Sequence, residues 1–248
     1  MPIFNESNPL AFFKALHLGF GETLAANHGS ETSIMGLMAQ ACDCFEENVE
    51  LQCDGLAALA CRGGCDTCCT LRVAATTPEI LTIVNYIRSP SFSMTNSGFD
   101  LAQRIADADL VTRGLDEAER LAVNHLCPFI EDGLCVIYEV RPLACRGHAS
   151  YDEEACLDAL AGRTDEVPIS VPHMTIRSFV QNAMQSALRD AGYAWGSYEL
   201  NQAVQMALTE KDRLSAWLSG GDVFEPALVA DMGLEEMAET FDAIKAQA

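Results

Sequence analysis

Residues 61–69 read Cys-Arg-Gly-Gly-Cys-Asp-Thr-Cys-Cys, which places four thiols in nine residues. Gaps of two or three residues allow thiolates to converge on one centre, because a tight turn brings their side chains together. Gly63 and Gly64 permit such a turn and let backbone N–H groups approach sulfur. Cys68 and Cys69 are adjacent, which predicts that their side chains diverge and serve two metals, or one metal and one structural role. The alternative, that several of these cysteines are simply small buried apolar residues, is disfavoured by their concentration.

A second cysteine-rich segment, residues 127–146, reads Cys-Pro-Phe-Ile-Glu-Asp-Gly-Leu-Cys-Val-Ile-Tyr-Glu-Val-Arg-Pro-Leu-Ala-Cys-Arg. The Asp132-Gly133 pair is a turn signal that can return Cys135 beside Cys127. The segment therefore predicts a knuckle that presents two thiols to one ion.

The end of this segment predicts a short helix and nearby positive charge. Pro142 suits the first turn of a helix, which would place Cys145 where free backbone N–H groups point. Such donors stabilise a thiolate and lower the pKa of its thiol. Arg141 and Arg146 either compensate the negative charge of a metal–thiolate group or form ordinary surface ion pairs.

Composition excludes several classes of function. The 248 residues carry 15 basic and 36 acidic side chains, a formal net charge of −21, which repels nucleic-acid phosphates and anionic membranes. No apolar run reaches the ~18 residues of a membrane span, and Met1-Pro2-Ile3-Phe4-Asn5 does not resemble a signal peptide. We therefore expect a cytoplasmic protein that binds neither nucleic acid nor membrane. Eleven cysteines, an odd number, argue against a disulfide framework and favour binding of soft metal ions.

The spacing of apolar residues is mostly helical. We expect helices over about 33–60, 77–87, 101–111, 116–126, 176–192, 200–218 and 233 to the terminus, with residues 71–75 extended. Thr77-Pro78-Glu79 is a strong helix start. The predicted fold is mainly α, a helical protein organised around a cysteine-rich metal-binding core, with little or no sheet. We expect three segments: 1–57 helical and packed on the core, 58–160 the cysteine-cluster core, and 161–248 helical.

At this point the motifs resemble a known family. The chain contains Cys61-x3-Cys65-x2-Cys68-Cys69 and, later, Cys135-x-Ile-Tyr-x-x-Arg-Pro-x-x-Cys145-Arg. This pattern resembles the cysteine-cluster family of zinc- or iron-chelating proteins, which is named for a Cys-x2-Cys-x2-Cys-Cys run; the first gap here has three residues instead of two. The resemblance covers roughly residues 58–160 and implies eight metal-ligating thiols: Cys61, Cys65, Cys68, Cys69, Cys127, Cys135, Cys145 and Cys156.

Eight thiols suffice for two tetrathiolate centres. His125 and His148 lie close to cysteines and could each replace a thiolate, although enough thiols are present without them. Cys42 lies on the apolar face of a predicted helix, where core packing is the favoured interpretation. We expect Cys44 and Cys53 to be free thiols.

Three functions compete. The leading one is a metal-binding protein that holds zinc or an iron–sulfur centre through thiolates, with the metal stabilising the fold. The second is an iron–sulfur enzyme of methyl transfer or redox chemistry. Cys61-x3-Cys65-x2-Cys68 has the spacing of the radical S-adenosylmethionine signature, and a flagellin lysine methylase has a similar cysteine cluster. The third is a metal carrier or store, which adjacent cysteines and nine methionines would suit.

Overall fold

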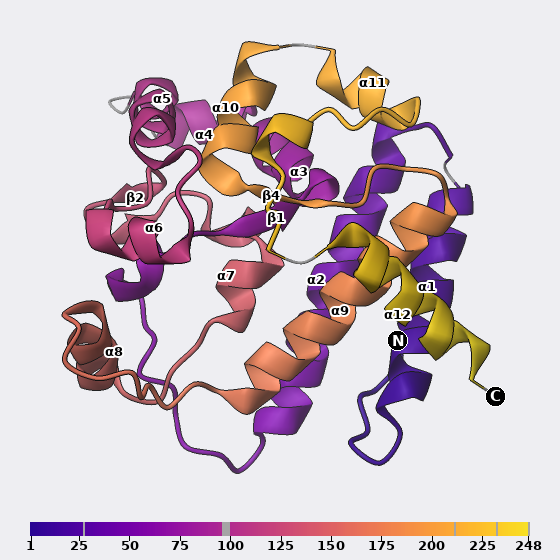
Figure 1. The fold of residues 1–248 in the computed structure, drawn as a ribbon, viewed down its shortest axis with the longest axis horizontal. Coiled ribbons are helices and arrows are strands. Elements are labelled where there is room, and N and C mark those ends of the chain that lie inside the picture. Colours follow the sequence, from indigo (N-terminus) through magenta and orange to yellow (C-terminus); the bar gives the residue numbers. More distant parts are fainter. Residues whose placement is uncertain (27, 96–99, 211, 232, 248) are drawn as a thin grey trace.

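The structure is a computed structural model that describes residues 1–26, 28–95, 100–210, 212–231 and 233–247 (Figure 1). Within these ranges the chain is mainly helical, which confirms the predicted fold class. The α-helices are α1 Pro9–Ala26, α2 Glu31–Cys53, α3 Thr77–Ile87, α4 Pro90–Thr95, α5 Leu101–Thr112, α6 Glu117–Val123, α7 Leu143–Gly147, α8 Glu153–Leu160, α9 Val171–Asp190, α10 Leu200–Thr209, α11 Arg213–Leu218 and α12 Leu234–Ala246. The short 3-10 helices are η1 Thr67–Thr70, η2 Tyr138–Val140 and η3 Glu225–Ala227. None of the described helices has the length and apolar character needed to cross a membrane.

Two small antiparallel sheets complete the described secondary structure. β1 (Ala74–Thr76) pairs with β4 (Ser197–Glu199), so that the residues before α3 lie beside those before α10. This strand covers the last two residues of the extended segment expected over 71–75 and continues to Thr76. β2 (Ile130–Glu131) pairs with β3 (Leu134–Cys135) in a hairpin. Its two loop residues, Asp132 and Gly133, have φ of 49° and 76°, as the predicted turn requires.

One hydrophobic cluster joins the two ends of the chain. α1 and α2 pack on α9, and α12 packs on α1, in the bundle seen on one side of the molecule (Figure 1). The cluster is centred on fully buried residues such as Phe20, Leu37, Val180 and Met184. Leu143, the first residue of α7, belongs to it, so the short helix that carries Cys145 is anchored in this core.

A second hydrophobic cluster lies on the other side of the molecule. It is built by α3, α5 and α10 with the β1–β4 sheet, and it includes Phe129 and Ile137 from the second cysteine-rich segment. Cys127 and Cys135 pack against it. The cysteine-bearing loops are therefore fixed to one core by their aromatic and aliphatic neighbours and to the other core through α7.

Two helix predictions were wrong in their extent. α2 ends at Cys53 and not near residue 60, because Gly55 adopts a positive φ of 76° that turns the chain away. The helix expected over 200–218 is two helices: Glu210 is extended, and the Arg213 side chain donates to the Met206 carbonyl at the end of α10. Lys211 and the C-terminal Ala248, which the predicted helices included, lie outside the described residues.

Glu79 ties α3 to α7. It is 1% exposed, and its carboxylate accepts hydrogen bonds from the Thr76 N–H and hydroxyl, both over 2.7 Å, as the capping box of α3. Its other oxygen accepts from the Leu143 N–H over 2.7 Å. One buried carboxylate therefore fixes the start of α3 relative to the helix that carries Cys145.

We predict that Glu79→Ala lowers the free energy of unfolding by about 3–5 kcal/mol, because it leaves three buried donors without a partner. The matched control is Glu119→Ala, which removes the same capping-box position from the exposed start of α6 and should cost about 0.5–1 kcal/mol. Urea unfolding followed by circular dichroism measures both. Equal losses for the two variants would contradict the assigned role of Glu79.

Candidate metal centre

The first cysteine motif is held against the segment that leads into α8. The Ala60 N–H donates to the Ser150 carbonyl over 2.9 Å, and the Ser150 N–H donates to the Cys61 sulfur over 3.4 Å. Arg62 forms an ion pair with Glu153 at the start of α8. α8 also packs on η1, which carries Cys68 and Cys69. These contacts bring Cys156 on α8 to the first motif.

The second motif surrounds its sulfurs with backbone donors. The Phe129 N–H hydrogen-bonds to the Cys127 sulfur, and the Ile137 N–H hydrogen-bonds to the Cys135 sulfur. Each donor lies two residues after its cysteine. Such N–H···S bonds favour the thiolate over the thiol and orient the sulfur, as the backbone around a metal–thiolate site does.

The two motifs meet through their backbones. The Cys127 N–H donates to the Cys69 carbonyl over 2.8 Å. The turns of the two motifs also approach closely, because a Cβ added at Gly133 would lie 3.6 Å from the Gly64 carbonyl oxygen. Segments far apart in the sequence therefore lie side by side, as a shared metal site would require.

The eight predicted ligands influence one another electrostatically in two overlapping groups. The pKa of Cys145 is raised by burial and then by the charges of Cys127, Cys135 and Cys68. The pKa of Cys69 is raised by the thiol of Cys68, by burial, and by the charges of Cys127 and Cys145. The pKa of Cys61 is raised by burial and then by Cys68, Cys65 and Cys156. Because such effects fade with distance, these thiols are neighbours. Cys68 belongs to both groups.

The thiols are near one another without enclosing an ion. Among the described residues, no three His, Cys, Asp or Glu side chains converge at distances that would hold a metal. All eleven cysteines are free thiols. The ligand set therefore stays a prediction, supported by proximity and by the N–H···S bonds.

Comparison with known proteins identifies this region. Residues 60–161 match the family model described as "CxxCxxCC: Putative zinc- or iron-chelating domain". This segment is similar to that family, and we refer to residues 60–161 as the CxxCxxCC domain after the model that they match. The match agrees with the resemblance found from the cysteine spacing and supports metal binding. No curated protein and no solved structure matched the chain.

Two local expectations for the CxxCxxCC domain were wrong. Cys68 and Cys69 do not diverge: the thiol of Cys69 donates a hydrogen bond to the sulfur of Cys68, which lowers the pKa of Cys68 to about 7 and raises that of Cys69. The pKa of Cys145 is raised and not lowered, because the thiol is buried among other thiols. Glu79 already accepts from the first free N–H of α7, at Leu143.

The two arginines of the second motif have different environments. Arg141 lies over the Tyr138 ring, 3.6 Å from its centroid. Burial raises the pKa of Cys135, and the charge of Arg141 partly opposes that rise. Arg146 is buried, forms an ion pair with Glu46, and donates to the backbone carbonyls of Arg141 and Glu139. Arg141 therefore provides positive charge to the CxxCxxCC domain, whereas Arg146 links it to α2.

The remaining cysteines and histidines lie elsewhere. Cys42 packs against the first hydrophobic cluster, and Cys44 is buried and accepts from the Asn48 amide over 3.5 Å. The Cys53 sulfur lies 3.8 Å from Nδ1 of His173. Burial lowers the pKa of His125 and His148, whose next strongest influences are Arg120 and Arg177 respectively.

Arg120, in the last turn of α6, is a buried arginine that the sequence did not reveal. Its side chain is fully buried, and its pKa is lowered by burial while Glu199 and Cys127 favour its charged form. Its Nε and Nη1 have no hydrogen-bond partner among the described residues. No spacing or motif marks a buried arginine seven positions before a cysteine, so only the packing of α6 identifies it.

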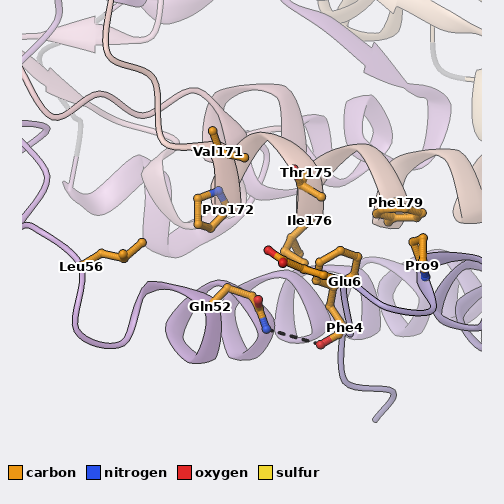
Figure 2. A pocket seen from close by; sticks show the side chains of 10 residues that line it. All are labelled: Phe4, Glu6, Pro9, Gln52, Leu56, Val171, Pro172, Thr175, Ile176 and Phe179. Atoms are coloured by element: carbon orange, nitrogen blue, oxygen red, sulfur yellow. Dashed lines mark hydrogen bonds between the residues drawn. The ribbon is translucent and has the colours of Figure 1, made fainter.

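A groove of about 470 Å³ lies away from the cysteines (Figure 2). It is bordered by the end of α2, the first turns of α9 and the N-terminal segment, where Gln52 donates to the Phe4 carbonyl. Its walls are mostly apolar, with Phe4, Ile176 and Phe179 among them. No cysteine lines it, so we assign it no part in metal binding.

We predict that Cys68 is alkylated by iodoacetamide at pH 7 faster than Cys61 in the metal-free protein. Thiolate is the reactive form, and the pKa of Cys68 is about 7 whereas burial raises that of Cys61 above its ordinary value. Cys61 is the more exposed of the two, so exposure alone would give the opposite order. Mass spectrometry of peptides measures the rates, and Cys69→Ala should slow the reaction of Cys68 by removing its hydrogen-bond donor.

Proposed function

We propose that the CxxCxxCC domain of this chain holds zinc or an iron–sulfur centre through Cys61, Cys65, Cys68, Cys69, Cys127, Cys135, Cys145 and Cys156. The observation that carries the proposal is the Cys127–Cys69 backbone hydrogen bond, which joins the two motifs of a domain family associated with zinc or iron chelation. A soft metal is the partner that eight neighbouring thiols favour.

The proximities support two tetrathiolate centres. One would use Cys69, Cys127, Cys135 and Cys145, whose thiols influence one another and the last three of which belong to the second motif. The other would use Cys61, Cys65, Cys68 and Cys156, which the Ser150 and Glu153 contacts gather at the start of α8. The hydrogen bond between Cys68 and Cys69 would put the two centres next to each other.

Metal would stabilise this arrangement. Thiolates from η1, the β2–β3 hairpin, α7 and α8 would be joined by bonds that do not exist in the unfolded chain, so binding free energy becomes folding free energy. The N–H groups of Ser150, Phe129 and Ile137 fit this role, since each already donates to a predicted ligand. On this proposal a zinc centre would organise the fold, whereas an iron–sulfur centre would take part in redox or enzymatic chemistry.

The direct test is metal content of protein purified without oxygen, together with its visible spectrum. We expect about two zinc ions per chain in a colourless sample, or iron and sulfide in a brown, reducible one. Zinc would support a structural site, and reducible iron would support redox or enzymatic chemistry. Protein that carries neither metal and binds neither after reduction would contradict the proposal.

A second prediction assigns the ligands. Cys65→Ser and Cys145→Ser, one from each proposed centre, should each lose about half of the bound metal and unfold at lower temperature. The matched control is Cys53→Ser, which changes a half-buried thiol of α2 outside the set and should keep full metal content. Full metal in both ligand variants would show that the assignment is wrong.

An enzyme is the second candidate, favoured by the spacing of Cys61, Cys65 and Cys68 and by the exposure of Cys61. Three thiolates on an iron–sulfur cluster would leave one iron open to S-adenosylmethionine. The described strands form only two-stranded antiparallel sheets, so any such activity would use a fold without the usual barrel. Cleavage of S-adenosylmethionine by the reduced protein tests it. Rapid, reversible loading with Cu(I) would instead favour a metal carrier.

A further inference from the structure

A cysteine and a histidine outside the predicted ligand set face each other where α2 meets α9. The end of α2 lies against the first turn of α9 (Figure 2). Cys53 is the last residue of α2, and its sulfur lies 3.8 Å from Nδ1 of His173, the third residue of α9. Cys53 is a free thiol, and both side chains are half-buried, so small solutes can reach them. A thiol in contact with a nitrogen base is the arrangement of an activated nucleophile.

Two hydroxyl groups hold the His173 ring in place. The Ser170 hydroxyl lies 2.8 Å from the same Nδ1, and Ser170 is fully buried. The Tyr151 hydroxyl lies 3.2 Å from the Ser170 hydroxyl. A hydroxyl can donate to a neutral ring nitrogen or accept from a protonated one, so this contact persists when the ring takes up a proton. The base therefore has an orienting group, which a histidine that activates a nucleophile requires.

The surroundings of the pair favour a neutral ring beside a negatively charged sulfur. Burial lowers the pKa of His173, so its ring is neutral at pH 7 and Nδ1 can accept a proton. His173 lies in the first turn of the 20-residue helix α9. The N–H groups of a first turn lack partners within the helix, and together they give this end a partial positive charge. Such a position stabilises a thiolate.

The surface around Cys53 is acidic. α2 contains no lysine or arginine, and the chain carries a formal charge of −21. Glu50 lies three residues before Cys53, on the same side of the helix, and Asp54 follows directly; both carboxylates are exposed. Exposed carboxylates raise the local concentration of cations and lower that of anions. A cationic reagent is therefore favoured over an anionic one at this thiol.

We propose that Cys53 is a modification site that exchanges with small disulfides, preferentially cationic ones, with His173 as its base. The Cys53 thiol gives its proton to Nδ1 of His173, and its sulfur attacks one sulfur of the disulfide. A new S–S bond joins Cys53 to half of the reagent while the old S–S bond breaks, and the leaving thiolate takes the proton from His173. One disulfide is consumed and one is formed, so no other oxidant is needed. Neither residue is a predicted metal ligand, and the proposal is therefore independent of the metal centre.

The test measures the reaction of the full chain with cystamine, a cationic disulfide, at pH 7 in the native and the urea-unfolded state. Peptide mass spectrometry follows the mixed disulfide at each cysteine. Half-burial alone would make Cys53 react more slowly in the native protein. We expect it to react about tenfold faster there, because only the fold brings His173 and the start of α9 to the sulfur. Cys42, a half-buried thiol of the same helix, is the internal control and should react more slowly when native.

Variants identify the base. His173→Gln should bring the native rate of Cys53 below its unfolded rate, and Ser170→Ala should give an intermediate rate because the ring loses its orienting hydroxyl. The matched control is His28→Gln, which removes a ring that lies against Tyr193 and should leave the rate unchanged. An unchanged rate in His173→Gln would overturn the proposal. So would a wild-type Cys53 that reacts more slowly native than unfolded, a result that requires no variant to fold.

The charge preference is tested with a second reagent. The rates of cystamine and of anionic glutathione disulfide at Cys53 are each divided by the rate of the same reagent with a neutral model thiol, N-acetylcysteinamide. We expect a corrected rate several-fold higher for cystamine, and this advantage should shrink in about 0.5 M NaCl, which screens exposed charges. Glu50→Gln should reduce the advantage. Equal corrected rates at low salt would overturn the preference for cationic disulfides.

Discussion

The backbone hydrogen bond between the Cys127 N–H and the Cys69 carbonyl is the contact on which the proposed site depends. It joins two loops that are far apart in the chain, and closing so long a loop costs conformational entropy. Hydrophobic burial offsets that cost: Phe129 and Ile137 are buried in one hydrophobic cluster and Leu143 in the other. The protein core thus brings the sulfurs near one another before any metal takes part.

Backbone N–H donors and the Glu79 carboxylate also hold the predicted ligands in place. N–H groups that follow Cys127 and Cys135 donate to their sulfurs, and Ser150 does the same for Cys61. Glu79 fixes the start of α7 and so the position of Cys145. The thiols are surrounded by groups that favour a thiolate, although burial and mutual repulsion raise the pKa of Cys145 and Cys127 in the absence of an ion.

Charge is distributed unevenly around the CxxCxxCC domain. The chain as a whole carries a formal charge of −21, yet Arg120 and Arg141 are placed beside the thiols of the second motif. Thiolates gathered in a partly dehydrated site would repel one another strongly, so nearby positive charge would favour the proposed centre. Arg120 is buried in the interior, and Arg141 lies over the Tyr138 ring.

The sequence by itself determined the helical fold class, the similarity of residues 60–161 to the CxxCxxCC family model, the Asp132-Gly133 turn and the start of α3. Spacing, turn chemistry and capping are local properties, which is why the sequence carries them. The spacing of apolar residues does not predict where α2 ends or that α10 and α11 are separate helices. The end of α2 depends on the turn at Gly55, and the break depends on the Arg213 side chain that donates to the end of α10. The hydrogen bond between Cys68 and Cys69, the occupied N–H at Leu143 and the buried charge of Arg120 were decided only by tertiary structure. The contact at Leu143 and the burial of Arg120 depend on how separate elements pack, and the contact between Cys68 and Cys69 depends on side-chain orientation within η1; sequence spacing fixes neither.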